Sequence, residues 1–393
     1  MPVKLGGSAG GSNPPLTPDV LLTVSTTWSP PYKVKALVRC FGGGGSGAAT
    51  NTSYYQYTTM GGTGGGAGEH AGSILELDPS ITYTIVAGSG GDRRYSANHN
   101  DNKAGYAGGT TSFSGSGITT ITANGGAGGG FLAMPTVGTV YNLAGGAGGS
   151  GGAGALYRHT GGAGGAVLKP VIANNNFNNA LSTGGGAVGL YGTGFAGGAI
   201  TFYSSNQIAV ASGGGGVNGA GGLCNTNSAT HHWSWGGSTY GPGGPGGDGS
   251  AGFQPWITGD TTGSTVPPGA FVLPDSDVWE ATNNFWPSKV MDRVNHTMSA
   301  STATMAPPGT GGCGRYNTTI AHGLGTGATL FGGGGAFASS IHGGTQDPRF
   351  CMGGKLGGGG GASGGDHWST SYFRWSGYGG DGGVVIEMLE RVL

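Results

Sequence analysis

Runs of glycine recur along this chain from Gly42 to Gly383, and they limit what it can fold into. Glycine makes up 95 of the 393 residues, whereas an average protein has about 7% glycine. Each glycine loses more backbone freedom on folding than any other residue. A folded structure must therefore recover that entropy through close packing of the backbones. Aromatic and polar inserts separate the runs, for example "YRHT" and "CNTNSATHHWSWGGSTY".

The alternation of run and insert predicts a serpentine chain, in which rods of similar length are joined by loops at both ends. A glycine segment can form a polyproline-II-like rod with three residues per turn and no internal hydrogen bonds. Rods that pack side by side can satisfy each other's N–H and C=O groups, and only glycine fits where backbones approach so closely. We therefore expect Gly164→Val to destabilise the fold strongly. Collagen is excluded because the runs keep no strict third-residue glycine.

Apolar alternation predicts ordinary β-strands in residues 19–41 and 383–393, and hairpins in 74–88 and about 110–124. The first hairpin should turn at Asp78. Four residues of the first segment should share one apolar face: Val34, Ala36, Val38 and Cys40. No convincing amphipathic helix is present. The sequence thus predicts an all-β fold with packed polyglycine-II helices, little or no α-helix, and a small β-sandwich cap formed by the N- and C-terminal strands.

These patterns divide the chain into three parts. Residues 1–41 supply the N-terminal strands of the cap or attachment region, 42–382 form the glycine lattice with distal loops, and 383–393 return to the cap. Within the lattice part lie the hairpins, at 74–124, and a segment of ordinary composition at 253–309, which is an insert or a subdomain.

Charge and cysteine content exclude several classes of protein. The net charge is −1 and charged residues are 8% of the chain, without the basic clusters that nucleic-acid binding requires. The sequence contains no 18-residue apolar run of the kind that predicts membrane insertion. Its N-terminus lacks a signal-peptide pattern. The four cysteines, Cys40, Cys224, Cys313 and Cys351, form no CxxC pair, so free thiols are expected and pairing stays open.

Motifs for chemistry are weak. Glycine-rich matches to nucleotide-binding loops lack a βαβ context, and the isolated aspartates do not follow a calcium-binding repeat. The tandem pair His231 and His232 has no identifiable third metal ligand, and Asp366 with His367 has no nucleophile elbow. We therefore expect no enzyme activity, no cofactor and no metal site.

The aromatic residues fall into two groups. Trp28, Phe41 and Phe113 lie in strand regions and are expected in the core. Those of the inserts are candidates for receptor contact, with packing over the lattice ends as the alternative, because aromatic side chains in loops supply large contact area at low entropic cost. The candidates are Tyr54, Tyr55, Tyr57, Trp233, Trp235, Tyr240, Trp368, Tyr372, Trp375 and Tyr378.

With these features, the chain resembles the glycine-rich tail-fibre proteins of tailed bacteriophages. The opening "LLTVSTTWSPPYKVKALVRCFGGGGSG" is similar to that family's start, and "ILELDPSITYTIVAGSGG" with "AGGTTSFSGSGITTITANGGAGGG" to its next section. The ending "GGDGGVVIEMLE" is similar to its closing strand. The similarity covers about the first third and the last dozen residues, and the middle agrees in composition.

The resemblance implies an adhesin at a tail-fibre or tail tip, assembled in the host cytoplasm, in which packed polyglycine-II rods present variable distal loops to the host. Its partners would be a bacterial surface receptor, either a glycan or an outer-membrane protein, and other virion proteins, with a homo-oligomer left open. The alternative is a structural virion fibre, capsid-decoration or extracellular matrix protein without receptor recognition. Long aromatic inserts favour the adhesin, because a spacer needs only short, bland turns.

Overall fold

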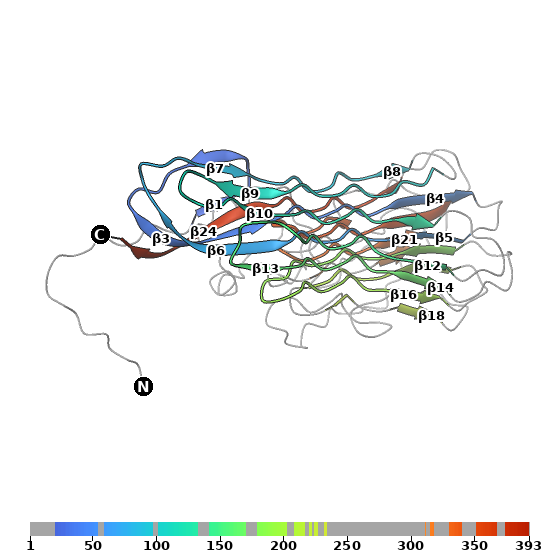
Figure 1. Cartoon of the computed structure of the whole chain (residues 1–393). Coiled ribbons are helices and arrows are strands. Elements are labelled where there is room, and N and C mark those ends of the chain that lie inside the picture. The colour runs from blue at the N-terminus through green and yellow to red at the C-terminus, as the bar shows by residue number, and fades with distance from the viewer. Residues whose placement is uncertain are drawn as a thin grey trace, which may run out of the picture.

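In a computed structural model the fold is all-β, and the described part of the chain contains no α-helix (Figure 1). No helix there is long and apolar enough to cross a membrane. The described residues are 20–53, 59–96, 101–132, 141–169, 179–202, 208–216, 220–221, 224–226, 232–233, 311, 315–317, 330–339, 351–367 and 374–392. The predicted insert at 253–309 lies outside them.

The first and last described strands meet in one antiparallel sheet of five strands. Its order is β1 (Val20–Leu22), β24 (Gly383–Arg391), β3 (Val34–Phe41), β6 (His70–Leu77) and β13 (Tyr157–His159). The prediction that the N- and C-terminal strands lie together is therefore confirmed.

A second antiparallel sheet packs on the first and completes the cap. Its order is β10 (Ile121–Ala123), β9 (Thr111–Ser114), β7 (Tyr83–Val86) and β2 (Thr26–Trp28). Strands β9 and β10 form the hairpin predicted near 110–124, with Phe113 opposite Ile121.

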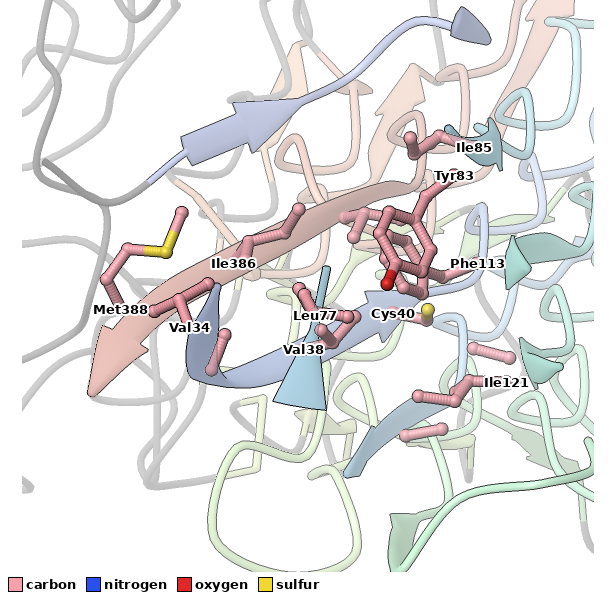
Figure 2. Close-up of a cluster of buried hydrophobic side chains, with 14 residues drawn as sticks. Val34, Val38, Cys40, Leu77, Tyr83, Ile85, Phe113, Ile121, Ile386 and Met388 are labelled. Carbon is pink, nitrogen blue, oxygen red and sulfur yellow. The ribbon is translucent and has the colours of Figure 1, made fainter. Parts of the chain in front are cut away.

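Apolar side chains from both sheets fill the space between them (Figure 2). The predicted face of β3 is confirmed, because Val34, Ala36, Val38 and Cys40 are all fully buried. From the second sheet, the rings of Tyr83 and Phe113 stack with their centroids 5.2 Å apart. Trp28 is only partly buried at the edge of this cluster, whereas Phe41 packs in a separate cluster on the other face of β3.

The hairpin predicted at 74–88 is wrong. Both strands exist, but β6 pairs with β3 and β13 in the first sheet, whereas β7 pairs with β2 and β9 in the second. The turn forms where expected: the Ser80 N–H donates to Asp78 Oδ1 at 2.8 Å. It carries the chain across the sandwich because each strand has an apolar face that the opposite sheet covers. Alternation predicts a strand but does not identify its partner.

From the cap, the chain runs back and forth through glycine segments to short strands at the opposite end of the molecule (Figure 1). We call this the distal end. Its strands are β4 (Ala49–Ser53), β5 (Thr59–Gly62), β8 (Tyr95–Ser96), β11 (Phe131–Leu132), β12 (Tyr141–Leu143), β14 (Val167–Lys169), β15 (Asn179–Ser182), β16 (Ile200–Phe202), β17 (Ile208–Ala211), β18 (Cys224–Thr226), β19 (His232–Trp233), β20 (Arg315–Asn317), β21 (Phe337–Ser339), β22 (Ser363–His367) and β23 (Arg374–Trp375).

Most pairs between the distal strands are parallel. One sheet has the order β11-β5-β15-β17-β19, a second β12-β14-β16-β18 and a third β20-β21-β22-β4, while β23 pairs with β8 alone. Parallel pairing is compatible with the serpentine path, because strands that run towards the distal end pair with one another, for example β4 with β22, and strands that return from it do the same, for example β5 with β15.

Backbone hydrogen bonds hold the glycine segments together, as segment 42–48 shows. Every third residue donates its N–H to the same neighbouring segment, with N···O distances of 2.8–3.2 Å. The donors and their acceptors are Gly42, Gly45 and Ala48 with 63–69, Gly43 and Ser46 with 106–109, and Gly44 and Gly47 with 377–380. A rod with three residues per turn requires this repeat. The polyglycine-II conformation itself stays a prediction.

The backbones lie too close for side chains between them. A Cβ added to Gly164 would overlap the carbonyl oxygen of Gly64 and lie 2.5 Å from its carbonyl carbon. Real Cβ atoms essentially never approach another heavy atom closer than 3.0 Å. By contrast, a Cβ added to Gly192, in a turn between two segments, would meet no atom within 4 Å.

Buried hydroxyl groups join neighbouring segments where glycine rods meet distal strands. Thr183 Oγ1 accepts the N–H of Gly64 at 3.1 Å and donates to the carbonyl oxygen of Gly165 at 2.6 Å. Thr63 likewise accepts from Gly130 and donates towards Ala144, and Ser212 accepts from Gly184 and donates to Gly198. All three residues are fully buried. A small side chain that both donates and accepts can replace two backbone partners at the point where the rod pattern ends.

Two of the four cysteines, Cys40 and Cys351, have described side chains. Cys40 and Cys351 are buried and form no disulfide. Burial raises the pKa of the Cys40 thiol well above its usual range, so this group stays protonated inside the cap. Such a thiol behaves as a small apolar side chain.

Candidate functional site

Of the ten predicted contact residues, Trp375 and Tyr378 have described side chains. Trp233 ends β19, where the structure describes only its backbone. The other predicted residues lie outside the described part of the chain: Tyr54, Tyr55, Tyr57, Trp235, Tyr240, Trp368 and Tyr372.

The strands that flank two of these undescribed segments are neighbours at the distal end. Strand β4 leads into 54–58, and β22 leads into 368–373. The two strands pair in parallel, with Ser53 opposite His367. The chain therefore enters the tyrosine segment and the Trp368 segment from adjacent strand ends.

Trp375 and Tyr378 lie along one side of the rod that leads back to the cap. Both are partly exposed, and Asp381, three residues further, is exposed, whereas the residues between them are buried. A spacing of three places side chains on the same face of a rod with three residues per turn. The two predicted aromatic residues are thus brought together.

Two arginines that sequence reasoning did not select complete this group. The guanidinium of Arg93 lies 4.0 Å from the ring centroid of Trp375 and 5.2 Å from that of Tyr378. The guanidinium of Arg94 lies 4.1 Å from the ring centroid of Tyr106. We call this group the arginine–aromatic cluster. Its members are Arg93, Arg94, Tyr95, Tyr106, Trp375 and Tyr378.

Backbone pairing fixes the cluster in place. Strand β8 pairs with β23 so that Tyr95 lies opposite Trp375, and their ring centroids are 4.3 Å apart. The Arg94 N–H donates to Ser376 Oγ at 2.8 Å, and the Ser376 N–H donates to the carbonyl oxygen of Arg94 at 3.0 Å. The two arginines are therefore carried by an anchored backbone, and each stacks on a ring.

The charge of the cluster is uncompensated within the described part of the chain. In the cap, Arg39 lies 3.4 Å from the carboxylate of Glu387, and Arg158 lies 3.0 Å from that of Glu69. Neither Arg93 nor Arg94 makes such an ion pair among the described residues, although Asp92 is adjacent in sequence and exposed. The cluster can thus offer an anionic ligand two ring-stacked guanidinium groups that no described carboxylate neutralises.

Two signals in the sequence could have revealed the cluster. The stretch "GGDRRYS" places two adjacent arginines and a tyrosine at the end of a glycine run, in a chain with only 16 basic residues. The second signal is the three-residue spacing of Trp375, Tyr378 and Asp381 within a glycine run. Tyr106 carries no local signal, because it comes from a different rod.

A second group of polar residues lies buried in the cap. Arg39 Nη1 donates to Tyr157 Oη at 2.9 Å, Tyr157 Oη lies 3.3 Å from His70 Nε2, and His70 Nδ1 lies 3.0 Å from the carbonyl oxygen of Gly189. Since a carbonyl only accepts, Nδ1 carries the proton and Nε2 accepts from the tyrosine. Burial lowers the pKa of His70 to about 3, so the ring is neutral. This chain of bonds joins cap to lattice and offers no accessible reactive group.

Among the described residues, no group of three or more His, Cys, Asp or Glu side chains could hold a metal ion. His231 lies outside these residues, and the side chain of His232 is not described. A scan against protein-family models found no match to the chain, and a search of curated proteins also found none.

Proposed function

We propose that the protein is a receptor-binding adhesin of a tailed bacteriophage, carried at a tail-fibre or tail tip. In this proposal the distal end faces the bacterium and binds a surface glycan or outer-membrane protein. The cap, which contains the first and last described strands, faces the rest of the virion. The resemblance of the chain's ends to phage tail-fibre proteins supports this assignment.

One structural observation carries the proposal. The strands that flank the predicted aromatic segments gather at one end of the molecule, opposite the cap (Figure 1). A lattice without side chains cannot encode specificity, whereas side chains held on a rigid frame lose little entropy on binding. Aromatic residues and arginine are also the types that most often dominate binding energy. The distal end combines both features.

The test compares aromatic residues at the two ends of the molecule. Fluorescently labelled protein is titrated onto a panel of bacterial strains, and one bound strain is used for the variants. Trp233→Ala with Trp235→Ala, and separately Trp368→Ala, should weaken adsorption by about 2 kcal/mol or more per key residue. Their melting temperatures should match that of the unchanged protein.

The matched control is Tyr191→Ala. Tyr191 is 70% exposed and follows Gly189, whose carbonyl contacts His70 of the cap, so it lies at the other end of the lattice. This variant should adsorb normally. If the distal variants also adsorb normally, or the unchanged protein binds no strain, the structural alternative replaces the adhesin.

A further inference from the structure

The arginine–aromatic cluster brings two ring-stacked arginines to the distal end, whereas the described cap has one such arginine, Arg391 on Tyr32. Arg93 and Arg94 are adjacent in sequence, yet they stack on rings from different segments. Arg93 stacks on Trp375 and Tyr378, and Arg94 stacks on Tyr106. Neither guanidinium makes an ion pair with a described carboxylate, and the buried Arg94 Nε has no hydrogen-bond partner among the described residues. The nearby Lys103 is already neutralised by Asp101 at 2.6 Å. At the distal end, Arg93 and Arg94 therefore carry positive charge that no described carboxylate neutralises.

Stacking prepares these arginines for a ligand. A ring below a guanidinium holds its plane while leaving the N–H groups at its edge free. Those N–H groups form a fork that matches the two oxygens of a carboxylate or a phosphate. Tyr106 remains 52% exposed beside Arg94, so an apolar surface adjoins the donors. The cluster therefore presents an anion-binding fork beside an aromatic surface.

From this arrangement we infer that the cluster binds an acidic sugar residue of a bacterial surface polysaccharide. The carboxylate or phosphate of the sugar pairs with the guanidinium of Arg93 or of Arg94, and the C–H groups of the sugar ring pack on the aromatic ring on which that arginine stacks. Nucleic acid fits less well, because it requires an extended basic surface and the chain has a net charge of −1. The inference rests on the proposed adhesin function and specifies its ligand.

Binding of defined polymers tests the inference on the full chain. The probes are polygalacturonate for the carboxylate, phosphomannan for the phosphate, neutral dextran, and poly-L-glutamate as an acidic polypeptide. The unchanged protein should bind at least one acidic polysaccharide about tenfold or more tightly than dextran or polyglutamate, as expected for charge-assisted hydrogen bonds. Added salt should weaken this binding.

Variants locate the binding site. Arg93→Gln with Arg94→Gln should reduce the affinity for the acidic polysaccharide about tenfold or more without changing the melting temperature, and Arg93→Gln alone serves if the double variant folds poorly. Arg391→Gln is the matched control, because Arg391 also stacks on a tyrosine, Tyr32 at 4.5 Å, but belongs to the cap. This control should bind like the unchanged protein.

Three results would overturn the inference: unchanged affinity in the Arg93 variants, binding to no acidic polysaccharide, or equal affinity for polyglutamate, which would indicate an acidic protein ligand. Cell adsorption of the same variants separates this inference from the proposed function. If Arg93→Gln adsorbs normally while Trp368→Ala does not, the adhesin stands and the acidic sugar site fails. If the protein binds the polysaccharide but no cell, the site stands and the adhesin fails.

Discussion

In the cap, Val38 of the first sheet and Phe113 of the second belong to one buried apolar cluster, whereas in the lattice the backbones of Gly45 and Gly66 are joined by one hydrogen bond of 2.8 Å. The two regions therefore depend on opposite properties of the sequence. The cap needs large apolar side chains at the inward-facing positions of its strands, so its sequence alternates between apolar and other residues. The lattice needs residues without side chains, because neighbouring backbones occupy that space. Its sequence therefore shows a high glycine content but almost no other pattern.

This difference determines how each region responds to substitution. Removing atoms should damage the cap, because it leaves a cavity among packed side chains. Adding atoms should damage the lattice, because backbones block the space that a Cβ would occupy.

We expect Gly164→Ala, and more so Gly164→Val, to lower the free energy of unfolding by more than about 4 kcal/mol. Single substitutions rarely cause so large a loss. The new Cβ would overlap the carbonyl group of Gly64, and the hydrogen bonds of both segments leave little room to shift. The measurements are soluble yield and the urea unfolding midpoint.

Gly192→Ala is the control for this prediction, since its Cβ meets no atom within 4 Å. Its effect should stay within about 0.5 kcal/mol. Similar stability of Gly164→Ala and Gly192→Ala would show that the lattice is loosely packed, and the contrast with the cap would disappear.

The corresponding change in the cap is Phe113→Ala. Phe113 is fully buried and stacks on Tyr83, so its truncation should cost about 3–5 kcal/mol. The control is Ile74→Ala on the outer face of β6, where the side chain is 47% exposed and the loss should be smaller. Equal unfolding midpoints for the two variants would mean that the sandwich interior does not hold the cap together.

Thr183→Val tests the junction between the two kinds of packing at the distal end. The substitution keeps the shape but leaves the N–H of Gly64 and the carbonyl of Gly165 without their partner. A buried polar group left unpaired costs about 1–3 kcal/mol. Thr27→Val, at an exposed position of β2, should change the free energy of unfolding little. If both variants unfold alike, the buried hydroxyls are not needed to connect the segments.

The same contrast explains what could be predicted from the sequence. The strands of the cap were located because Val34, Ala36 and Val38 carry a period of two, which is a local property. The pairing of these strands is not a local property. Strands β6 and β7 are consecutive in the chain, yet they belong to different sheets, and Tyr83 of β7 packs against the first sheet from the second. The serpentine path was predictable from run lengths. The identity of neighbouring rods was not predictable, because glycine has no side chain whose type could indicate which segment packs against it.

The candidate site was predictable to a similar extent. Trp375 and Tyr378 were selected from composition, and their spacing places them on one face. Arg93 joins them because residues 91–96 happen to lie beside 374–379 in the lattice, a contact between parts of the chain almost three hundred residues apart. Only the backbone hydrogen-bond network determines that proximity. A single sequence contains no local pattern that would predict long-range pairing of this kind.

The smallest expected effect concerns the polar chain that joins cap to lattice. Burial between Phe41, which stacks on the ring at 4.5 Å, and Tyr157 lowers the pKa of His70 to about 3, and the charges of Arg39 and His159 act in the same direction. The unfolded chain has the ordinary histidine pKa of about 6.5. Between these values the unfolded state binds a proton that the folded state does not, so stability falls as the pH drops from about 6.5 towards 3.

We therefore expect His70→Asn to flatten the pH dependence of unfolding between pH 6.5 and 4, by at most about 1.4 kcal/mol per pH unit. The slope is measured rather than the absolute stability, because the substitution also removes the stack on Phe41. His159→Asn is the control: burial lowers the pKa of His159 as well, but that ring is less buried, so most of the slope should remain. Asp78, whose pKa is lowered by hydrogen bonds from Ser80, contributes acid sensitivity to every variant alike. Equal slopes for His70→Asn and the unchanged protein would mean that folded His70 takes up a proton over this pH range as the unfolded chain does, so that the hydrogen bond from Tyr157 to Nε2 would be lost as the pH falls.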